Sequence, residues 1–217
     1  MKIVFFVFDR ITALDAIGPY EVLARLPSAE VQFAGPVAGL VRTDNGCLGL
    51  QADVSIDEVT ACDVLVVPGG FGTRPLEHDA RVIDWIRAVD RTTTITASVC
   101  TGSFLLARAG LLLGRRANTH WTERARLANY GAIPCADRVV RDGKYATAAG
   151  VSAGIDLALT LAVELSGELV AQAIQLALEY APEPPLDAGN EERAPAAVRA
   201  LVRARSQARH AELARNA

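Results

Sequence analysis

The stretch Ile95-Thr-Ala-Ser-Val-Cys-Thr-Gly-Ser-Phe-Leu-Leu-Ala-Arg-Ala-Gly110 passes from a strand-like segment through one cysteine directly into a helix-like segment. Small residues stand two positions before and two positions after Cys100, at Ser98 and Gly102. This spacing is typical of a nucleophile elbow, a sharp strand-to-helix turn whose small flanking residues let the nucleophile stand clear of the sheet. We therefore predict a strand, a tight turn and a helix, with a reactive thiol at the turn.

Apolar runs and helical segments alternate on both sides of this stretch. The runs Lys2–Phe8 and Asp63–Val67 are continuous and apolar, which is typical of strands covered on both faces. Segments with helical periodicity lie at 15–26, 80–89, 101–109, 152–165 and 168–180. Strands that alternate with helices favour right-handed βαβ units, so we predict a doubly wound α/β fold, with a mostly parallel sheet and helices on both faces.

Turn residues mark further short strands and the end of the α/β pattern. The stretch Asp44-Asn45-Gly46 predicts a small hairpin over residues 40–52, and short strand-like pieces flank the turn Asp142-Gly143 within residues 129–145. The proline-rich stretch Ala181–Pro185 then interrupts the alternation of strands and helices. We expect an α/β domain over residues 1–185 and a helical C-terminal appendage over residues 186–217.

Composition narrows the class of function. The chain has 217 residues, a net charge of −3 and three histidines, and it shows no basic cluster of the kind that nucleic acid requires. No apolar run reaches the length of a membrane span, and the apolar N-terminus lacks a signal-peptide cleavage site. The four cysteines stand far apart, which argues against a zinc site and a disulfide framework. We expect a cytoplasmic protein that acts on a small molecule, with no nucleic-acid, membrane or metal partner.

Cys100 is the favoured nucleophile among the four cysteines. At a helix N-terminus a thiol meets backbone N–H groups and the positive end of the helix dipole, so we expect a lowered pKa and a thiolate. The alternative is that Cys100 is a small buried residue, which is how most free cysteines behave. For Cys47, Cys62 and Cys135 we favour that structural interpretation.

Two neighbouring strand ends supply partners for this thiol, because ligands in open α/β sheets bind beyond the carboxyl ends of the strands. The glycine-rich loop Pro68–Gly72 follows one strand, and its glycines fit either an oxyanion hole or a plain tight turn. Asp15 and Glu21 follow the first strand. Asp15 is a candidate helix N-cap and also a candidate general acid or base, since burial beside a thiolate raises the pKa of a carboxyl group.

Further residues are candidates for the wall of a pocket. His120 and Trp121 fit either a helix start with a core tryptophan or a pocket wall. Gly150 is expected at a backbone bend beside the elbow helix, where a side chain would press on its neighbour. The remaining candidates for the wall are Ile17, Gly69, Phe71 and Val151.

Four motifs together resemble the ThiJ/PfpI branch of the class I glutamine-amidotransferase-like superfamily, over about residues 2–180. They are Val67–Gly72, Ser98–Ser103, Thr119–Trp121 and Thr147–Asp156. The resemblance implies a flavodoxin-like fold. Within this branch, Asp15 and the Cys100-Thr101 pair look most like the isocyanide (isonitrile) hydratases. Those enzymes add water to an isocyanide to give an N-substituted formamide, without metal or organic cofactor, and are dimers.

The resemblance also implies roles for individual residues. Cys100 would attack the isocyanide carbon while Asp15 delivers a proton to that carbon, which gives a thioimidate that water then hydrolyses. Thr101 would orient Asp15 or the water. Backbone N–H groups of Gly70 and Thr101 would stabilise charge near the reacting centre. The chain would then be a homodimer that needs no cofactor.

Two other functions stay open at this point. Protease-like and deglycase-like relatives carry histidine where this chain has Thr101, and their acidic residue matches the region of Glu21. These departures argue against a peptidase. A thiol-dependent glyoxalase, deglycase or redox stress protein is the second candidate. The third is a non-catalytic ligand-binding domain related to AraC-type regulators, which need an additional DNA-binding region of roughly a hundred residues.

Overall fold

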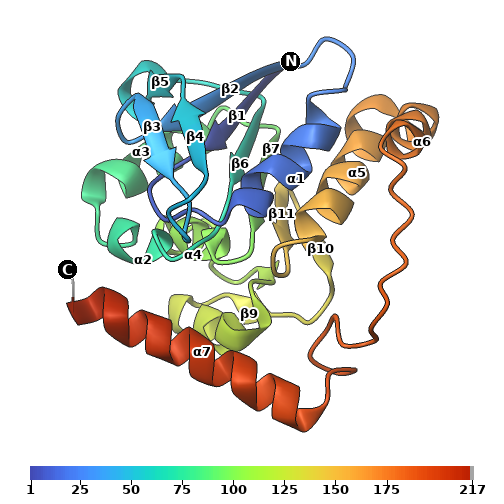
Figure 1. Cartoon of the computed structure of the whole chain (residues 1–217). Helices are drawn as coiled ribbons and strands as arrows, with labels where there is room; N and C mark the ends of the chain where they lie inside the picture. The colour runs from blue at the N-terminus through green and yellow to red at the C-terminus, as the bar shows by residue number, and fades with distance from the viewer. Residues whose placement is uncertain (216–217) are drawn as a thin grey trace. The chain divides into compact units, whose positions relative to one another are not determined.

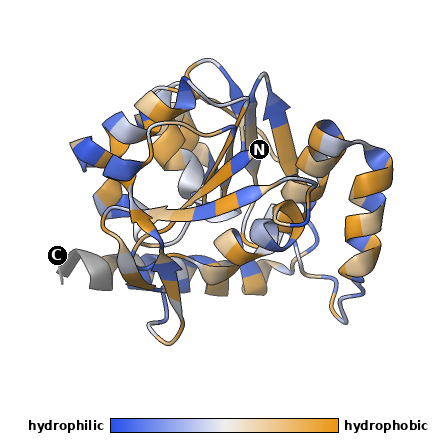
Figure 2. Ribbon diagram, turned by 90° about the horizontal axis from the view of Figure 1, so that it is seen from above, coloured by the Kyte–Doolittle hydropathy of each residue, from blue (hydrophilic) through white to orange (hydrophobic). Residues whose placement is uncertain are grey.

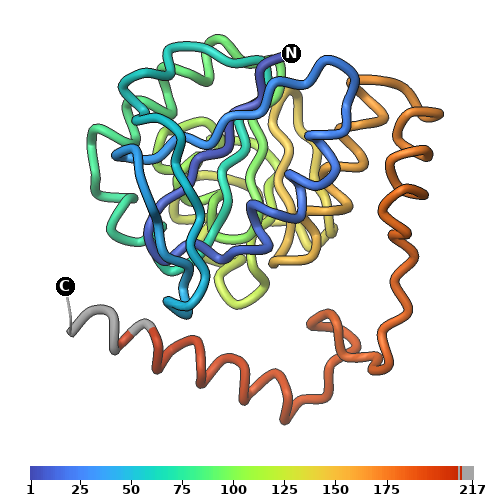
Figure 3. Tube along the Cα trace, turned by 45° about the horizontal axis from the view of Figure 1, so that its top comes forward, coloured from blue at the N-terminus to red at the C-terminus, as the bar shows by residue number. Residues whose placement is uncertain are grey.

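The computed structural model describes residues 1–215, so the last two residues of the predicted appendage lie outside the described part of the chain. The chain divides into two compact units, Met1–Leu178 and Glu179–Ala217. The first unit carries the sheet and the candidate site. Figure 3 traces the irregular stretch that leads from the end of the first unit to the last helix.

Within residues 1–215, seven strands form the central sheet, in the order β10-β11-β7-β6-β1-β2-β5. Their bounds are β1 (Lys2–Phe6), β2 (Glu30–Gly35), β5 (Val54–Ser55), β6 (Val64–Val67), β7 (Ile95–Val99), β10 (Val139–Asp142) and β11 (Tyr145–Ala148). The edge pair β10–β11 is antiparallel, and the other neighbours pair in parallel. The predicted mostly parallel sheet is confirmed.

Helices cover both faces of this sheet (Figure 1). They are α1 (Ala13–Leu23), the 3-10 helix η1 (Ile56–Glu58), α2 (Thr73–Leu76), α3 (Ala80–Asp90), α4 (Gly102–Arg108), the 3-10 helix η2 (Trp121–Tyr130), α5 (Ala153–Ser166) and α6 (Glu168–Ala177). One core cluster joins strand residues to α3, α4 and η2, and the other joins them to α1, α5 and α6. The predicted doubly wound arrangement is therefore confirmed.

Alternating side chains of the strands supply these two cores. Val4 and Phe6 of β1 belong to the first cluster, whereas Ile3 and Phe5 belong to the second. All four side chains are fully buried, and the strands at the centre carry mainly hydrophobic residues (Figure 2). The continuous apolar run at the N-terminus thus forms a strand with both faces covered, as predicted.

Two smaller strand pairs lie outside the main sheet. The hairpin of β3 (Gly39–Arg42) and β4 (Gly49–Ala52) is the one predicted from Asp44–Gly46. The parallel pair of β8 (Arg116–Ala117) and β9 (Ile133–Pro134) was not predicted, because two-residue strands show no periodicity. The strand-like pieces predicted around Asp142-Gly143 form the β10–β11 edge pair.

Helix α1 begins before Asp15, which corrects one of the two interpretations of this residue. The N-cap of α1 is Thr12, and Asp15 lies inside the first turn, fully buried. The Thr12 hydroxyl donates to Asp44 Oδ2 at 3.0 Å. Asp15 is therefore not the N-cap, and its side chain is available for another partner.

The second unit contains one helix among its described residues, α7 (Ala196–Arg215). The Arg199 guanidinium lies close to the start of this helix and donates to the carbonyl groups of Glu191 and Ala194, at 3.0 and 2.9 Å. An ion pair between Arg203 and Glu191 adds a further link within the unit. No helix in residues 1–215 is long and apolar enough to cross a membrane.

Candidate active site

Cys100 occupies the turn between β7 and α4, with a φ of +55°. A non-glycine residue in this left-handed region stores strain that the surrounding structure must hold. The Cys100 N–H donates to the carbonyl groups of Ala148 and Ala149, at 3.2 and 3.1 Å, and its own carbonyl accepts from Thr119 Oγ1 at 2.8 Å. These bonds hold the strained turn, which is the predicted nucleophile elbow.

Gly102 shows why the elbow needs a small residue after the cysteine. A Cβ atom on Gly102 would lie 2.0 Å from the Val67 carbonyl oxygen and 2.6 Å from that of Pro68. The start of α4 therefore packs directly on the end of β6. Ser98, the small residue before the cysteine, is fully buried in β7.

Asp15 reaches the elbow from α1, through the glycine-rich loop. Its Oδ2 accepts a hydrogen bond from the Gly69 N–H at 3.0 Å. Its Oδ1 accepts no hydrogen bond from an N–H or O–H group of the described residues. A Cβ atom on Gly69 would lie 2.5 Å from the Thr101 nitrogen and 2.9 Å from Asp15 Oδ2. Glycine at this position thus lets Asp15, Thr101 and the loop come together.

Asp15 and Cys100 form a buried acid–thiol pair. Burial raises the pKa of Asp15 to about 7, and the charge of Asp44 adds to this effect, whereas hydrogen bonds from the Gly69 N–H and the Cys100 thiol oppose it. Burial, followed by the negative charge of Asp15, holds the pKa of Cys100 well above its usual range. The thiol hydrogen-bonds to the carboxylate, so the two groups titrate as a coupled pair.

The raised pKa of Cys100 corrects the prediction of a thiol that ionises by itself. Backbone N–H groups of Thr101 and Val151 do favour the thiolate, as expected at a helix N-terminus, but desolvation and the facing carboxylate outweigh them. The predicted rise in the pKa of Asp15 is confirmed.

Thr101 binds the glycine-rich loop. The Gly70 N–H donates to Thr101 Oγ1 at 2.9 Å, and this hydroxyl lies 3.2 Å from the Gly70 carbonyl oxygen and 3.3 Å from Thr73 Oγ1. The Gly70 N–H is therefore occupied, which corrects its predicted oxyanion role. Thr101 acts on Asp15 indirectly, because it fixes the loop whose Gly69 N–H binds the carboxylate.

Gly150 and Val151 form another part of the surroundings of Cys100. The Val151 N–H donates a hydrogen bond to the Cys100 sulfur, and Val151 itself has a φ of +42°. A Cβ atom on Gly150 would lie 2.4 Å from His120 Cδ2. The neighbour that requires glycine here is thus the His120 ring, not the elbow helix as predicted.

His120 is the N-cap of η2, so the predicted helix start is confirmed. Its ring lies against Gly150, which also brings it to the surroundings of the elbow. Ile17, Phe71 and Trp121 are half-buried, and their place in the pocket wall stays a prediction. Among the described residues, no three His, Cys, Asp or Glu side chains are placed to hold one metal ion.

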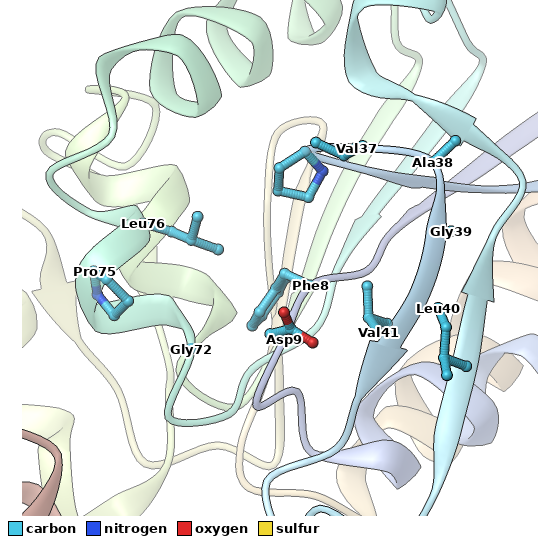
Figure 4. Close-up of a pocket in the computed structure, with 11 residues that line it drawn as sticks. Phe8, Asp9, Val37, Ala38, Gly39, Leu40, Val41, Gly72, Pro75 and Leu76 are labelled. Carbon is cyan, nitrogen blue, oxygen red and sulfur yellow. The ribbon is translucent and has the colours of Figure 1, made fainter. Parts of the chain in front are cut away.

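A cavity of about 400 Å³ lies next to the glycine-rich loop (Figure 4). Its lining residues are Phe8, Asp9, Pro36, Val37, Ala38, Gly39, Leu40, Val41, Gly72, Pro75 and Leu76. They come from separate segments of the chain, which is why sequence reasoning missed this cavity. Asp15, Cys100 and Thr101 are not among them, so the cavity is distinct from the acid–thiol pair.

Comparisons with known proteins agree with this geometry. The model of the DJ-1/PfpI family matches residues 1–164. An isonitrile hydratase from Pseudomonas putida is 45% identical over 198 residues, which cover 91% of this chain and 86% of the relative. Deglycase PfpI from Pyrococcus furiosus is 27% identical over 150 residues, 68% of this chain and 89% of the relative.

A solved structure of a related protein also matches this chain. The crystal structure of a ThiJ/PfpI family protein from Pseudomonas syringae matches with a TM-score of 0.90 and 35% sequence identity, over 93% of this chain and 84% of that one. The sheet order, the strained cysteine at the elbow and these matches lead to one conclusion. The chain belongs to the DJ-1/PfpI family.

Proposed function

We propose that this protein is an isocyanide hydratase, in which Cys100 is the nucleophile and Asp15 the general acid and base. The observation that carries the proposal is the buried Asp15–Cys100 pair, in which the thiol hydrogen-bonds to the carboxyl group and burial raises the pKa of Asp15 to about 7. The 45% identity to an isonitrile hydratase over most of both chains supports the same chemistry. The substrate is a small molecule, R–NC.

The first half of the reaction uses the proton of the Cys100 thiol. The thiol proton moves to Asp15, which leaves a thiolate beside a neutral carboxylic acid. The thiolate then attacks the terminal carbon of the isocyanide, and Asp15 gives its proton to that carbon. The products are a Cys100 thioimidate, S–CH=N–R, and an Asp15 carboxylate.

The second half of the reaction adds water. The Asp15 carboxylate takes a proton from a water molecule, whose oxygen attacks the thioimidate carbon. Asp15 passes this proton to the nitrogen. When the C–S bond breaks, the hydroxyl proton returns to the acid–thiol pair, and the N-substituted formamide leaves. One water is consumed for each isocyanide.

We extend the proposal to assembly, location and domain limits, as the family resemblance and the sequence pattern suggest. The protein acts as a homodimer in the cytoplasm, without cofactor. We keep residues 1–185 as the α/β domain and place the helical appendage after them, a few residues beyond the structural division between Leu178 and Glu179. Sedimentation of the full chain, which gives the mass of the particle in solution, tests the assembly.

The activity is tested by incubating the purified protein with an alkyl isocyanide and measuring the formamide by liquid chromatography and mass spectrometry. We expect turnover by the wild type, loss of turnover in Cys100→Ala, and unchanged turnover in Cys47→Ala, whose cysteine is exposed. A wild-type protein that leaves the isocyanide intact contradicts the proposal.

A thiol-dependent deglycase is the second candidate, because Deglycase PfpI is a relative that aligns over 68% of this chain. Consumption of methylglyoxal by the wild type, without any conversion of isocyanide, favours this function. Binding of a ligand that is unaffected by both Cys100→Ala and Asp15→Asn, with neither reaction, favours the non-catalytic alternative.

A further inference from the structure

The His120 ring is held in one tautomer. Its Nδ1 accepts from the Thr122 N–H at 3.4 Å and lies 2.8 Å from Thr122 Oγ1. A backbone N–H can only donate, so Nδ1 carries no proton, and in the neutral ring the proton sits on Nε2. Burial lowers the pKa of His120, which favours the neutral ring. His120 therefore presents a fixed Nε2–H donor.

Two contacts link His120 to the surroundings of Cys100. The residue before it, Thr119, donates its hydroxyl to the Cys100 carbonyl oxygen at 2.8 Å. The ring itself lies on Gly150, where a Cβ atom would be 2.4 Å from Cδ2 and 3.2 Å from Nε2. Gly150 in turn precedes Val151, whose N–H reaches the cysteine sulfur.

The Nε2 atom has no hydrogen-bond partner among the described residues. Among the described residues, the side-chain polar atoms that are fully buried and lack a hydrogen-bond partner are Asp15 Oδ1, Glu77 Oε1, Ser98 Oγ and Arg141 Nη1. His120 Nε2 is not one of them, so it is not closed off from other molecules. A neutral N–H group without an acceptor among the described residues, on a half-buried ring beside Gly150, can donate to a bound molecule.

We propose that His120 donates a hydrogen bond from Nε2–H to the nitrogen of the Cys100 thioimidate and thereby speeds its hydrolysis. This inference rests on the proposed function. When water attacks the thioimidate carbon, negative charge develops on the nitrogen, and a donor fixed in advance stabilises that charge. His120 keeps its own proton throughout, since the proton that the nitrogen takes up comes from water through Asp15.

The matched test variant is His120→Asn. Asparagine is a good N-cap residue, so its side chain keeps a hydrogen-bond acceptor at the start of η2, while the Nε2–H donor of the imidazole is removed. Loss of one donor at a developing charge slows the affected step by roughly 100-fold. We therefore expect kcat to fall by about this factor, while the rate of thioimidate formation stays at the wild-type value.

Intact-protein mass spectrometry after rapid quenching separates the two steps. With an alkyl isocyanide, His120→Asn should accumulate a species heavier than the free protein by the mass of the isocyanide. His78→Asn, the same change at an exposed histidine, should not accumulate it. If His120→Asn clears the adduct as fast as the wild type, the inference is overturned and the proposed function stands. If the wild type forms neither adduct nor formamide, the proposed function itself fails.

A second measurement uses the wild-type protein, so it does not depend on whether a His120 variant folds. Nitrogen-15 NMR of histidine-labelled wild-type protein at pH 7, with His78→Asn and His210→Asn used for assignment, reports the tautomer of His120. We expect a neutral ring with the proton on Nε2. A proton on Nδ1, or a charged ring, overturns the inference.

Discussion

The Gly69 N–H donates to Asp15 Oδ2 at 3.0 Å, and this bond connects the loop after β6 to the helix after β1. The same loop is fixed by Thr101, whose hydroxyl accepts from the Gly70 N–H. The acid, the loop and the residue after the nucleophile therefore form one unit. Changes at any of the three positions should affect the pKa of Asp15, because the Gly69 N–H bond is one of its causes.

Gly69→Ala should reduce both stability and activity. Its Cβ atom would stand 2.5 Å from the Thr101 nitrogen, so the loop must move away from the elbow and the bond to Asp15 is lost. Overpacking of this kind costs about 1–3 kcal/mol. Urea unfolding and isocyanide turnover measure the two effects. Gly189→Ala is the control, because a Cβ atom there meets open space, and a control as destabilised as Gly69→Ala contradicts the steric explanation.

Thr101→Val should lower the free energy of unfolding by about 1 kcal/mol and should also lower kcat, since a methyl group of similar size replaces the hydroxyl and the bond from the Gly70 N–H is lost. Thr101→Ser keeps the hydroxyl that binds Gly70 and should keep most of the activity. Steady-state kinetics of both variants provide the test. Equal loss in the two variants would show that the hydroxyl bond is not the cause.

Asp15→Asn should lower the pKa of the Cys100 thiol, because the charge of Asp15 is one of the causes that raise it. The thiol then ionises more readily, yet turnover falls by about 10²–10⁴-fold, since no group delivers the proton to carbon. The absorbance of the thiolate near 240 nm as a function of pH, compared with Cys100→Ala, gives the pKa. A pKa that stays the same or rises in Asp15→Asn is the contrary result.

Stability should depend on pH through Asp15. Its pKa rises from 3.8 to about 7 on folding, so the folded state binds the proton more tightly than the unfolded state. The stabilisation from this proton is complete below about pH 4 and is lost as the pH rises through 7. Thermal unfolding from pH 4 to 8 should therefore show a larger decline for the wild type than for Asp15→Asn. Parallel curves would refute this assignment.

The elbow and the strands could be predicted because they follow local rules. Continuous apolar runs marked β1 and β6, and small residues at Ser98 and Gly102 marked the turn at Cys100. These signals lie within a few residues of each other in the sequence. The alternation of strands and helices then restricted the topology to a doubly wound sheet.

The parts that sequence reasoning missed depend on distant segments. The pKa of Cys100 is decided by burial and by a carboxylate from α1, neither of which is visible in the residues around the elbow. The Gly70 N–H is occupied by a hydroxyl from Thr101, and Gly150 is required by the ring of His120. Such tertiary contacts carry no signal in local composition or periodicity.

The central claim is that the Asp15–Cys100 pair hydrates an isocyanide through a thioimidate. The most direct measurement is a single turnover with excess enzyme and an alkyl isocyanide labelled with carbon-13 at its terminal carbon, followed by rapid quenching and carbon NMR. The account predicts that the label passes through a protein-bound thioimidate to the formyl carbon in the wild type, and that it stays in the isocyanide with Cys100→Ala. Formamide produced at the same rate by Cys100→Ala, or no formamide from the wild type, would contradict it.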